Sequence, residues 1–200
     1  MSKRRTPIAK DLPKHFANGS YRRACTEPLP WLTKARELRR SADLVWNLFA
    51  SELQAFSNGG DDNGEPFTGS VAMMLYGFVF ENLLKAGHAA KGVAIKADGN
   101  FALKGHTLED FADELPMTLS AEERELLERL ENFLVWAGRY PIPLYAQDLY
   151  PRSMADGSKA VLYGISSGDR MRIDTLITRI EAVLPTEDEA LESYVRNSGA

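Results

Sequence analysis

Cysteine and long apolar runs are scarce in this chain. Its 200 residues include one cysteine, Cys25, which excludes a disulfide within the chain. The longest apolar run, Val71 to Phe80, is much shorter than the roughly 20 residues of a membrane-spanning helix. Lys3, Arg4 and Arg5 are followed by charged residues and prolines, not by the apolar stretch of a signal peptide. We therefore expect a cytoplasmic protein that does not enter a membrane.

The motifs of common metal and cofactor sites are also missing. The chain has no HExxH, no Glu-x-x-His pair, no cysteine cluster and no Walker sequence. Of its three histidines, His88 shares a predicted helix face with Glu81, and His106 precedes Asp110 by one helical turn. Neither pair is a complete ligand set, so we expect no metal and no cofactor.

Charge is distributed unevenly along the chain. Residues 1–40 have a charge balance of +8 and residues 41–200 a balance of −12, within a net charge of −4. A basic region on an acidic body can contact phosphate groups, which makes Arg36, Arg39 and Arg40 candidate phosphate-binding residues. The alternative is that these arginines form the solvated face of a helix.

The first half of the chain predicts two long helices after a basic, irregular arm at residues 1–27. Pro28 and Pro30 open the first helix, which ends at Asn58. Its apolar residues recur at steps of three and four, as in an amphipathic helix: Ala35, Leu38, Ala42, Val45, Phe49, Leu53 and Phe56. The second helix, residues 68–91, is apolar on nearly every side, which indicates the central helix of a bundle. Gly77 and Gly87 within it predict the close approach of neighbouring segments.

The second half predicts shorter elements. Asp98-Gly99 favours a small β-hairpin or an extended loop near 94–103. A short helix at 106–114 comes next, and then a helix that begins with the capping box Ser120–Glu123. After an irregular stretch at 141–168, an amphipathic helix follows Gly168, and Thr186–Glu189 caps a last short helix. We predict an all-α fold, an antiparallel bundle of four to five main helices in a single domain at 28–196.

Arg139-Tyr140-Pro141, at the end of the helix capped by Ser120, is a candidate ligand site. A guanidinium group can bind carboxylate or phosphate, and a tyrosine offers a flat face and a hydroxyl. The alternative is an internal ion pair with a packed ring. Lys85, one turn after Glu81, is a further candidate contact for phosphate.

Three segments together resemble the HEPN family (higher eukaryotes and prokaryotes nucleotide-binding). They are FENLLKA at 80–86, GHTLEDFADEL at 105–115, and L-x-x-F-x-x-W-A-G-R-Y-P at 130–141, and the resemblance covers about residues 35–145. It implies an antiparallel helical bundle, often a homodimer, in toxin–antitoxin or defence systems, sometimes beside a nucleotidyltransferase partner. The resemblance also implies a possible activity, since the catalytic members of the family are metal-independent endoribonucleases. Their motif is an arginine followed, after roughly four to six residues, by a histidine for proton transfer.

The chain departs from that ribonuclease pattern. After Arg139, the positions for the histidine hold Leu144, Tyr145 and Ala146. Our leading hypothesis is therefore a non-catalytic HEPN-like protein that binds RNA, a nucleotide or a protein partner. A second hypothesis is an endoribonuclease with a divergent site, built from Arg139, Tyr140 and either His88 or His106. A third is a structural protein–protein interaction module.

Overall fold

The computed structural model describes residues 19, 21–23, 25–59, 67–92, 102–103 and 105–197. These residues are mostly helical, which confirms the all-α class. In chain order the elements are α2 (Pro28–Ser57), α3 (Gly69–Ala90), α4 (Leu108–Asp113), α5 (Ala121–Asn132), the π-helix η1 (Phe133–Ala137), the 3₁₀-helix η2 (Ala146–Leu149), β1 (Arg152–Ser153), β2 (Lys159–Ala160), α6 (Asp169–Glu181) and α7 (Glu187–Arg196). Within the described ranges, no helix is long and apolar enough to cross a membrane.

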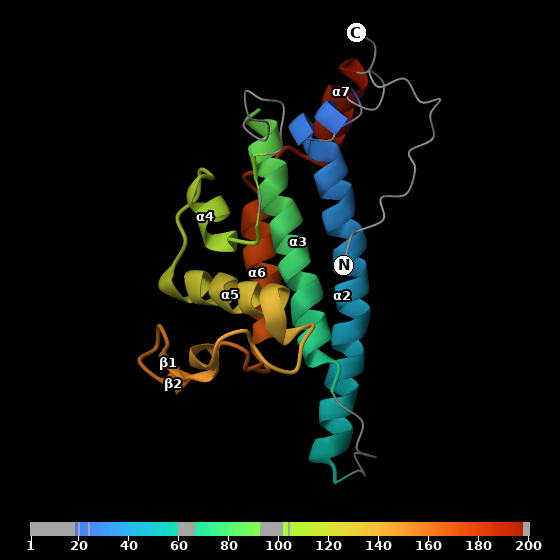
Figure 1. Ribbon diagram of the computed structural model, residues 1–200. Coiled ribbons are helices and arrows are strands. Elements are labelled where there is room, and N and C mark those ends of the chain that lie inside the picture. Colours follow the sequence, from blue (N-terminus) through green and yellow to red (C-terminus); the bar gives the residue numbers. More distant parts are fainter. Residues whose placement is uncertain are drawn as a thin grey trace, which may run out of the picture.

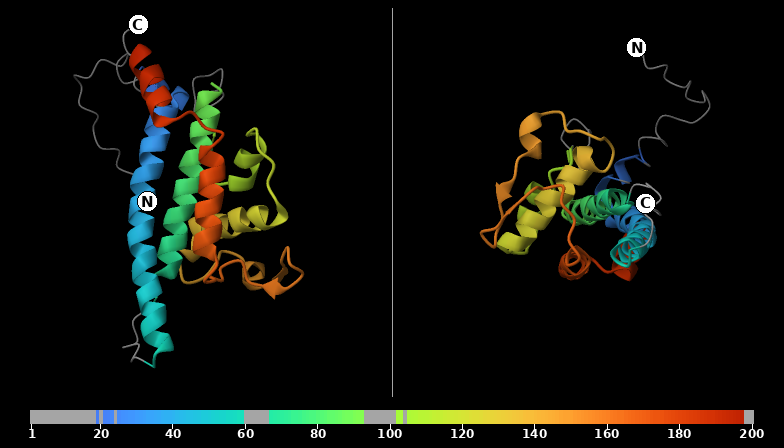
Figure 2. Two further views of the ribbon diagram at one scale, coloured as in Figure 1. Left: turned by 180° about the vertical axis from the view of Figure 1, so that it is seen from behind. Right: turned by 90° about the horizontal axis from the view of Figure 1, so that it is seen from below.

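Three helices run side by side along the length of the molecule (Figure 1). The chain descends α2 and returns along α3, so these two helices are antiparallel, and α6 runs in the same direction as α3. α5 lies across α3 and α6, and Figure 2 shows this crossing when α2, α3 and α6 are viewed nearly end-on. α7 packs beside the beginning of α2. The bundle thus consists of three aligned helices, α2, α3 and α6, with α5 packed across two of them.

α3 is the central helix, as its sequence predicts. Its large side chains are fully buried on several sides, among them Met73, Tyr76, Phe80 and Leu84. α2, α4, α5, η1 and α6 all contact it. α2 contributes a buried stripe of Ala35, Ala42, Trp46 and Phe49, whereas Leu53 and Phe56 near its end are exposed. The last turns of α2 extend beyond α3, so no helix of the described residues covers their apolar side chains (Figure 1).

The predicted close approach at the two glycines of α3 is confirmed. A methyl group on Gly77 would lie 2.6 Å from Leu134 Cγ and 3.1 Å from the Leu130 carbonyl oxygen. At Gly87 it would lie 2.5 Å from Leu115 Cδ2 and 2.9 Å from Leu184 Cδ2. The absence of a side chain at both positions lets neighbouring segments pack directly on the α3 backbone, which offsets the poor helix propensity of glycine.

The α5 helix widens into a π-helix before it ends. Ser120 caps α5, since its hydroxyl accepts from the Glu123 N–H while the Glu123 carboxylate accepts from the Ser120 N–H. From Phe133 the turns are wider, and the Gly138 N–H donates to the Phe133 carbonyl at 3.1 Å. A π-turn inserts an extra residue and so redirects the side chains that follow. Here it sets the direction of the Arg139-Tyr140 pair.

A buried ion pair fastens the connection between α5 and α6. Arg129 donates to both carboxylate oxygens of Asp169, at 2.8 and 2.7 Å, and also to the Gly164 carbonyl. Asp169 accepts from the Ser166 N–H at 2.8 Å and is fully buried. All of its strong acceptor positions are therefore used, as a buried carboxylate requires.

The hairpin expected near 94–103 falls mainly on residues outside the described ranges. A two-stranded ladder is present at another place, where β1 pairs antiparallel with β2 across a turn that contains Asp156 and Gly157, with φ of 81° at the glycine. At the end of the predicted arm, residues 19, 21–23, 25 and 26 are helical. Glu27 there accepts hydrogen bonds from Ser193 and Asn197, so this part of the arm is docked on α7.

Candidate functional site

The Arg139-Tyr140 pair lies on the rim of a wide hollow of about 770 Å³. We call it the aromatic hollow, and its main lining residues are Ser70, Trp136, Arg139, Tyr140, Leu149 and Tyr163. Ser70 comes from the first turn of α3, Trp136 from the π-helix, and Tyr163 from the segment before α6. Gly138 lets this corner form, because a methyl group there would collide with Met74 and lie 2.9 Å from the Phe133 carbonyl.

Aromatic rings form much of this hollow. Trp136 and Tyr163 pack edge to face, with ring centroids 5.5 Å apart, and the Trp136 Nε1 donates to Asn132. These two rings are fixed, whereas Tyr140 is 58% exposed. Next to the hollow, the chain exposes further apolar and aromatic side chains: Ile142, Leu144, Tyr145 and Tyr150. Such a surface offers several flat faces for stacking.

Arg139 has no acidic partner among the described residues. Its Nη2 donates to the Val135 carbonyl at 2.6 Å, and its guanidinium carbon lies 5.4 Å from the Tyr140 ring centroid. The carbonyl and the ring orient the guanidinium without neutralising its charge. The internal ion pair considered as an alternative for this arginine is not formed within the described part of the chain.

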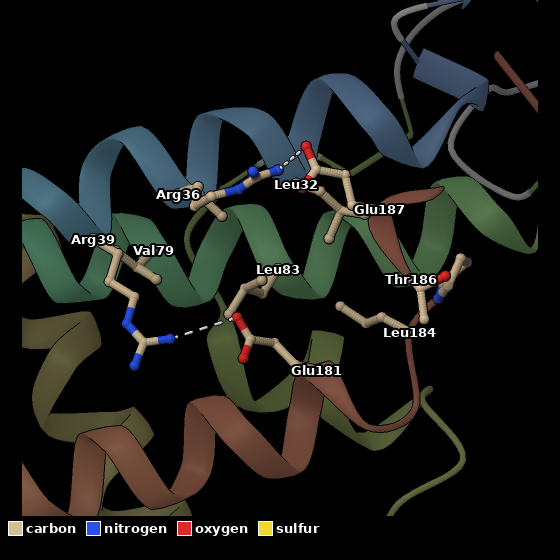
Figure 3. Close-up of a pocket in the computed structure, with 11 residues that line it drawn as sticks. Leu32, Arg36, Arg39, Val79, Leu83, Glu181, Leu184, Thr186 and Glu187 are labelled. Carbon is tan, nitrogen blue, oxygen red and sulfur yellow. Dashed lines mark ion pairs between the residues drawn. The ribbon is translucent and has the colours of Figure 1, made fainter. Parts of the chain in front are cut away.

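Arg36 and Arg39 line a different depression, between α2, α3, α6 and the beginning of α7 (Figure 3). We call it the α2–α7 cleft, and it has a volume of about 280 Å³. Its interior is apolar, with Leu32, Val79, Leu83 and Leu184. Arg36 forms an ion pair with Glu187, and Arg39 pairs with Glu181 at 3.6 Å and with Asp174 at 3.3 Å.

Ion pairs connect α2 with α6 along a seam between the two helices, beyond the α2–α7 cleft. Arg170 of α6 pairs with Asp43 of α2 at 2.7 Å and with Asp174 at 2.8 Å, and the Tyr76 hydroxyl donates to Asp43. The seam therefore carries as many acids as bases near Arg36 and Arg39, which weakens its attraction for phosphate. Arg40 is exposed and has no ion pair within the described residues.

Lys85 and His106 meet at one carboxylate. Glu81 accepts from Lys85 Nζ at 2.5 Å and lies 2.8 Å from His106 Nδ1. Lys85 is buried, and its Nζ lies 5.5 Å from the centroid of the Phe111 ring. This network holds the beginning of α4 against α3 and keeps a buried cation paired. Lys85 is thus used inside the protein rather than at its surface.

His88 has a structural environment. It is fully buried, its Nε2 lies 3.0 Å from the Phe111 carbonyl, and its ring packs edge-on against Phe111 at 5.7 Å. Nδ1 lies 3.4 Å from a Glu114 carboxylate oxygen but makes no well-aligned hydrogen bond within the described residues. A solvent-borne substrate cannot reach this imidazole without rearrangement of α4.

Within one chain, the two described histidines, His88 and His106, do not converge with Arg139. The aromatic hollow includes Ser70 at the start of α3, whereas Glu81, which holds His106, and His88 lie further along the same helix. At 1.5 Å rise per residue, these positions are about 16 and 27 Å from Ser70. The acid–base pair that an endoribonuclease needs is therefore not assembled in the described part of a single protomer.

Comparisons against family models, curated proteins and solved structures find no match for this chain. Within the described residues, no group of three or more His, Cys, Asp or Glu side chains is placed to hold a metal ion.

Cys25 is buried, and burial raises the pKa of its thiol, which a hydrogen bond with Tyr21 offsets only in part. A protonated, buried thiol is a poor nucleophile. Cys25 is therefore not a candidate catalytic residue.

Ser70 and Trp136 are lining residues that the sequence does not predict. Ser70 is distant in sequence from Arg139, and Trp136 lies inside the segment that ends in RYP without a signal for ligand contact. For Tyr163, as for Tyr145 and Tyr150, the sequence leaves open whether the ring lines a pocket or covers the bundle. The excess of tyrosines at 140–163 was the available signal. It did not show which rings face the arginine, because a packed ring and a ligand-facing ring have the same sequence.

Proposed function

We propose that this protein is a non-catalytic, HEPN-like helical protein that binds single-stranded RNA or a nucleotide in the aromatic hollow. Arg139 contacts a phosphate group, and Tyr140 stacks on a base. One observation carries the proposal: Arg139 has no acidic partner among the described residues, on the rim of a hollow lined with aromatic rings. The candidate arginines of α2 that line the cleft, in contrast, each form an ion pair with an acid.

The chemistry of the hollow favours single strands over duplexes. Unpaired bases expose their flat faces, and stacking on an aromatic side chain contributes about 1–3 kcal/mol per base. Tyr140 is sufficiently exposed to accept a base, and Trp136 with Tyr163 provides a rigid wall beside it. Because one guanidinium contacts phosphate, we expect the RNA affinity to depend only weakly on salt. The slope of the logarithm of the binding constant against the logarithm of the salt concentration should be about −0.7 per phosphate contacted on a single strand.

The wider context is part of the same proposal. The HEPN resemblance supports a homodimer that acts in a toxin–antitoxin or defence system, with a nucleotidyltransferase-type protein as a further partner. A single cysteine, buried and protonated, supports a cytoplasmic location.

The first prediction concerns Arg139→Ala. Binding of a fluorescein-labelled single-stranded RNA, measured by fluorescence anisotropy, is expected to weaken about tenfold or more, because a charge-assisted contact to phosphate is lost. Tyr140→Ala is expected to weaken binding to a similar extent through the loss of stacking. Arg40→Ala is the matched control, since Arg40 is also exposed and lacks an ion pair within the described residues, and its affinity is expected to equal that of the wild type.

Three results would contradict this function. They are no binding of RNA or of mononucleotides by the wild type, equal binding by Arg139→Ala, and equal losses for the Arg139 and Arg40 variants. The RNA recovered after incubation with EDTA is expected to be full length. Its cleavage would contradict the non-catalytic part of the proposal and would favour the endoribonuclease hypothesis, in which a histidine is supplied by a second chain.

A further inference from the structure

The α2–α7 cleft combines an apolar interior with both signs of charge at its rim. Figure 3 shows Leu83 between two ion pairs, Arg36–Glu187 on one side and Arg39–Glu181 on the other, with Leu184 beside it. The cleft thus offers an apolar group a place to be buried and offers a charged group of either sign a partner.

The Arg39–Glu181 pair is the looser of the two ion pairs. Its nitrogen–oxygen distance of 3.6 Å is well above the roughly 2.7–2.9 Å of a tight charge-assisted hydrogen bond. Asp174 holds Arg39 from the other side at 3.3 Å, which leaves donors of the guanidinium unused. Glu181 is about half exposed, and within the described residues it makes no other ion pair. Both side chains can therefore accept a ligand while they keep their positions.

From this geometry we propose that the cleft binds a free hydrophobic α-amino acid, with leucine as the representative ligand. Arg39 binds the carboxylate of the ligand, and Glu181 binds its ammonium group. The aliphatic side chain lies among Leu32, Leu83 and Leu184. This function is separate from nucleic-acid binding and does not depend on it.

Charge and size exclude the other simple ligand classes. A fatty acid or a phosphate ester would place its negative charge against Glu181 and Glu187, and an amine would meet Arg36 and Arg39. A zwitterion satisfies one group of each sign. The volume of about 280 Å³ is at the lower limit for pockets that hold drug-sized molecules, roughly 300–1,000 Å³, and suits a single amino acid.

The cleft and the aromatic hollow are independent in space. Leu83 in the cleft and Ser70 in the hollow are separated along α3 by about 20 Å, at 1.5 Å rise per residue. Variants in one site can therefore be tested without disturbing the other.

The test measures binding to the full-length protein by isothermal titration calorimetry. The ligands are leucine, glycine, 4-methylpentanoate and 3-methylbutylamine, of which the last three lack the side chain, the ammonium group and the carboxylate, respectively. Leucine is expected to bind saturably, and each analogue is expected to bind about tenfold more weakly or worse. Glu181→Gln is expected to weaken leucine binding about tenfold. The matched control is Glu192→Gln, an exposed glutamate of α7 that does not line the cleft.

The proposal is overturned by any of three results. These are no saturable binding of leucine up to about 10 mM, equal binding of leucine and either charge-truncated analogue, or wild-type affinity in Glu181→Gln. Because Glu181 is at the surface, its replacement leaves the fold intact, and a loss of binding in this variant reports on the cleft itself.

Discussion

Arg129 lies in the last turn of α5 and Arg139 lies two residues after η1, and the two arginines have opposite environments. Arg129 is buried, bidentate to Asp169 and bonded to a main-chain carbonyl. Arg139 is exposed, and its charge is not neutralised by an acid within the described residues. A guanidinium serves both roles because its planar fork binds carboxylate and phosphate alike. The first therefore stabilises the fold, and the second is available to a ligand.

Asp169→Asn tests whether the Arg129–Asp169 ion pair stabilises the fold. Burial raises the pKa of the Asp169 carboxyl, but hydrogen bonds from Arg129 and Ser166 outweigh it, and the net pKa is below the ordinary value. Such a group contributes stability above the ordinary pKa of about 3.9, and the contribution is lost as pH falls through the lower pKa of the folded state. Asp169→Asn is expected to lose about 3–5 kcal/mol at pH 7, because Arg129 keeps its charge in the interior.

The pH dependence of this variant supplies its own control. In urea unfolding experiments, the difference in unfolding free energy between wild type and Asp169→Asn should be constant above about pH 5 and should shrink below about pH 4. Asp188→Asn, at an exposed position in the first turn of α7, is expected to change stability by less than about 0.5 kcal/mol. A difference for Asp169→Asn that persists undiminished at low pH would show that the Arg129 ion pair is not its cause.

At the scale of the elements, the helices were predictable and the turn between α5 and η2 was not. The Pro28 start, the apolar α3 and both capping boxes are encoded locally, so sequence pattern was sufficient for them. The π-helix has no comparable local signal, because a single wider turn depends on how Gly138 packs on Met74 of α3. The hairpin at 152–160 does have a local signal, Asp156-Gly157, the same dipeptide that predicts a hairpin at residues 98–99.

Gly138→Ala tests whether this turn supports the hollow. The added methyl group would meet the Met74 Cβ and the Phe133 carbonyl, neither of which can rotate away. We expect a loss of about 1–3 kcal/mol in unfolding free energy and weaker RNA binding, since the Arg139-Tyr140 corner must shift. Gly19→Ala is the control, because the same addition meets nothing within 4 Å there and should leave both properties unchanged. Wild-type stability and RNA affinity in Gly138→Ala would contradict this view of the π-turn.

At the scale of the whole molecule, three groups of candidate residues lie against α3. The aromatic hollow lies at its beginning, whereas the α2–α7 cleft, with Val79 and Leu83, and the Glu81–Lys85–His106 network share one stretch of its second half through alternating residues. Sequence reasoning named Arg139, Tyr140, Arg36, Arg39, Lys85 and His106 as candidates. It could not assign them to separate places, since their grouping depends on contacts between segments far apart in the chain. The separation of Arg139 from His88 and His106, the histidines within the described ranges, is the consequence that matters most for function.

The most direct test of the central claim is photo-crosslinking of a single-stranded RNA that contains 4-thiouridine, followed by mass spectrometry of the tryptic peptides. We predict that the crosslinks map to the segment that includes Trp136, Tyr140 and Tyr145, and that Arg139→Ala reduces their yield about tenfold. Crosslinks confined to the arginine-bearing part of α2, with none in residues 133–163, would contradict the assignment of the aromatic hollow as the RNA-binding site.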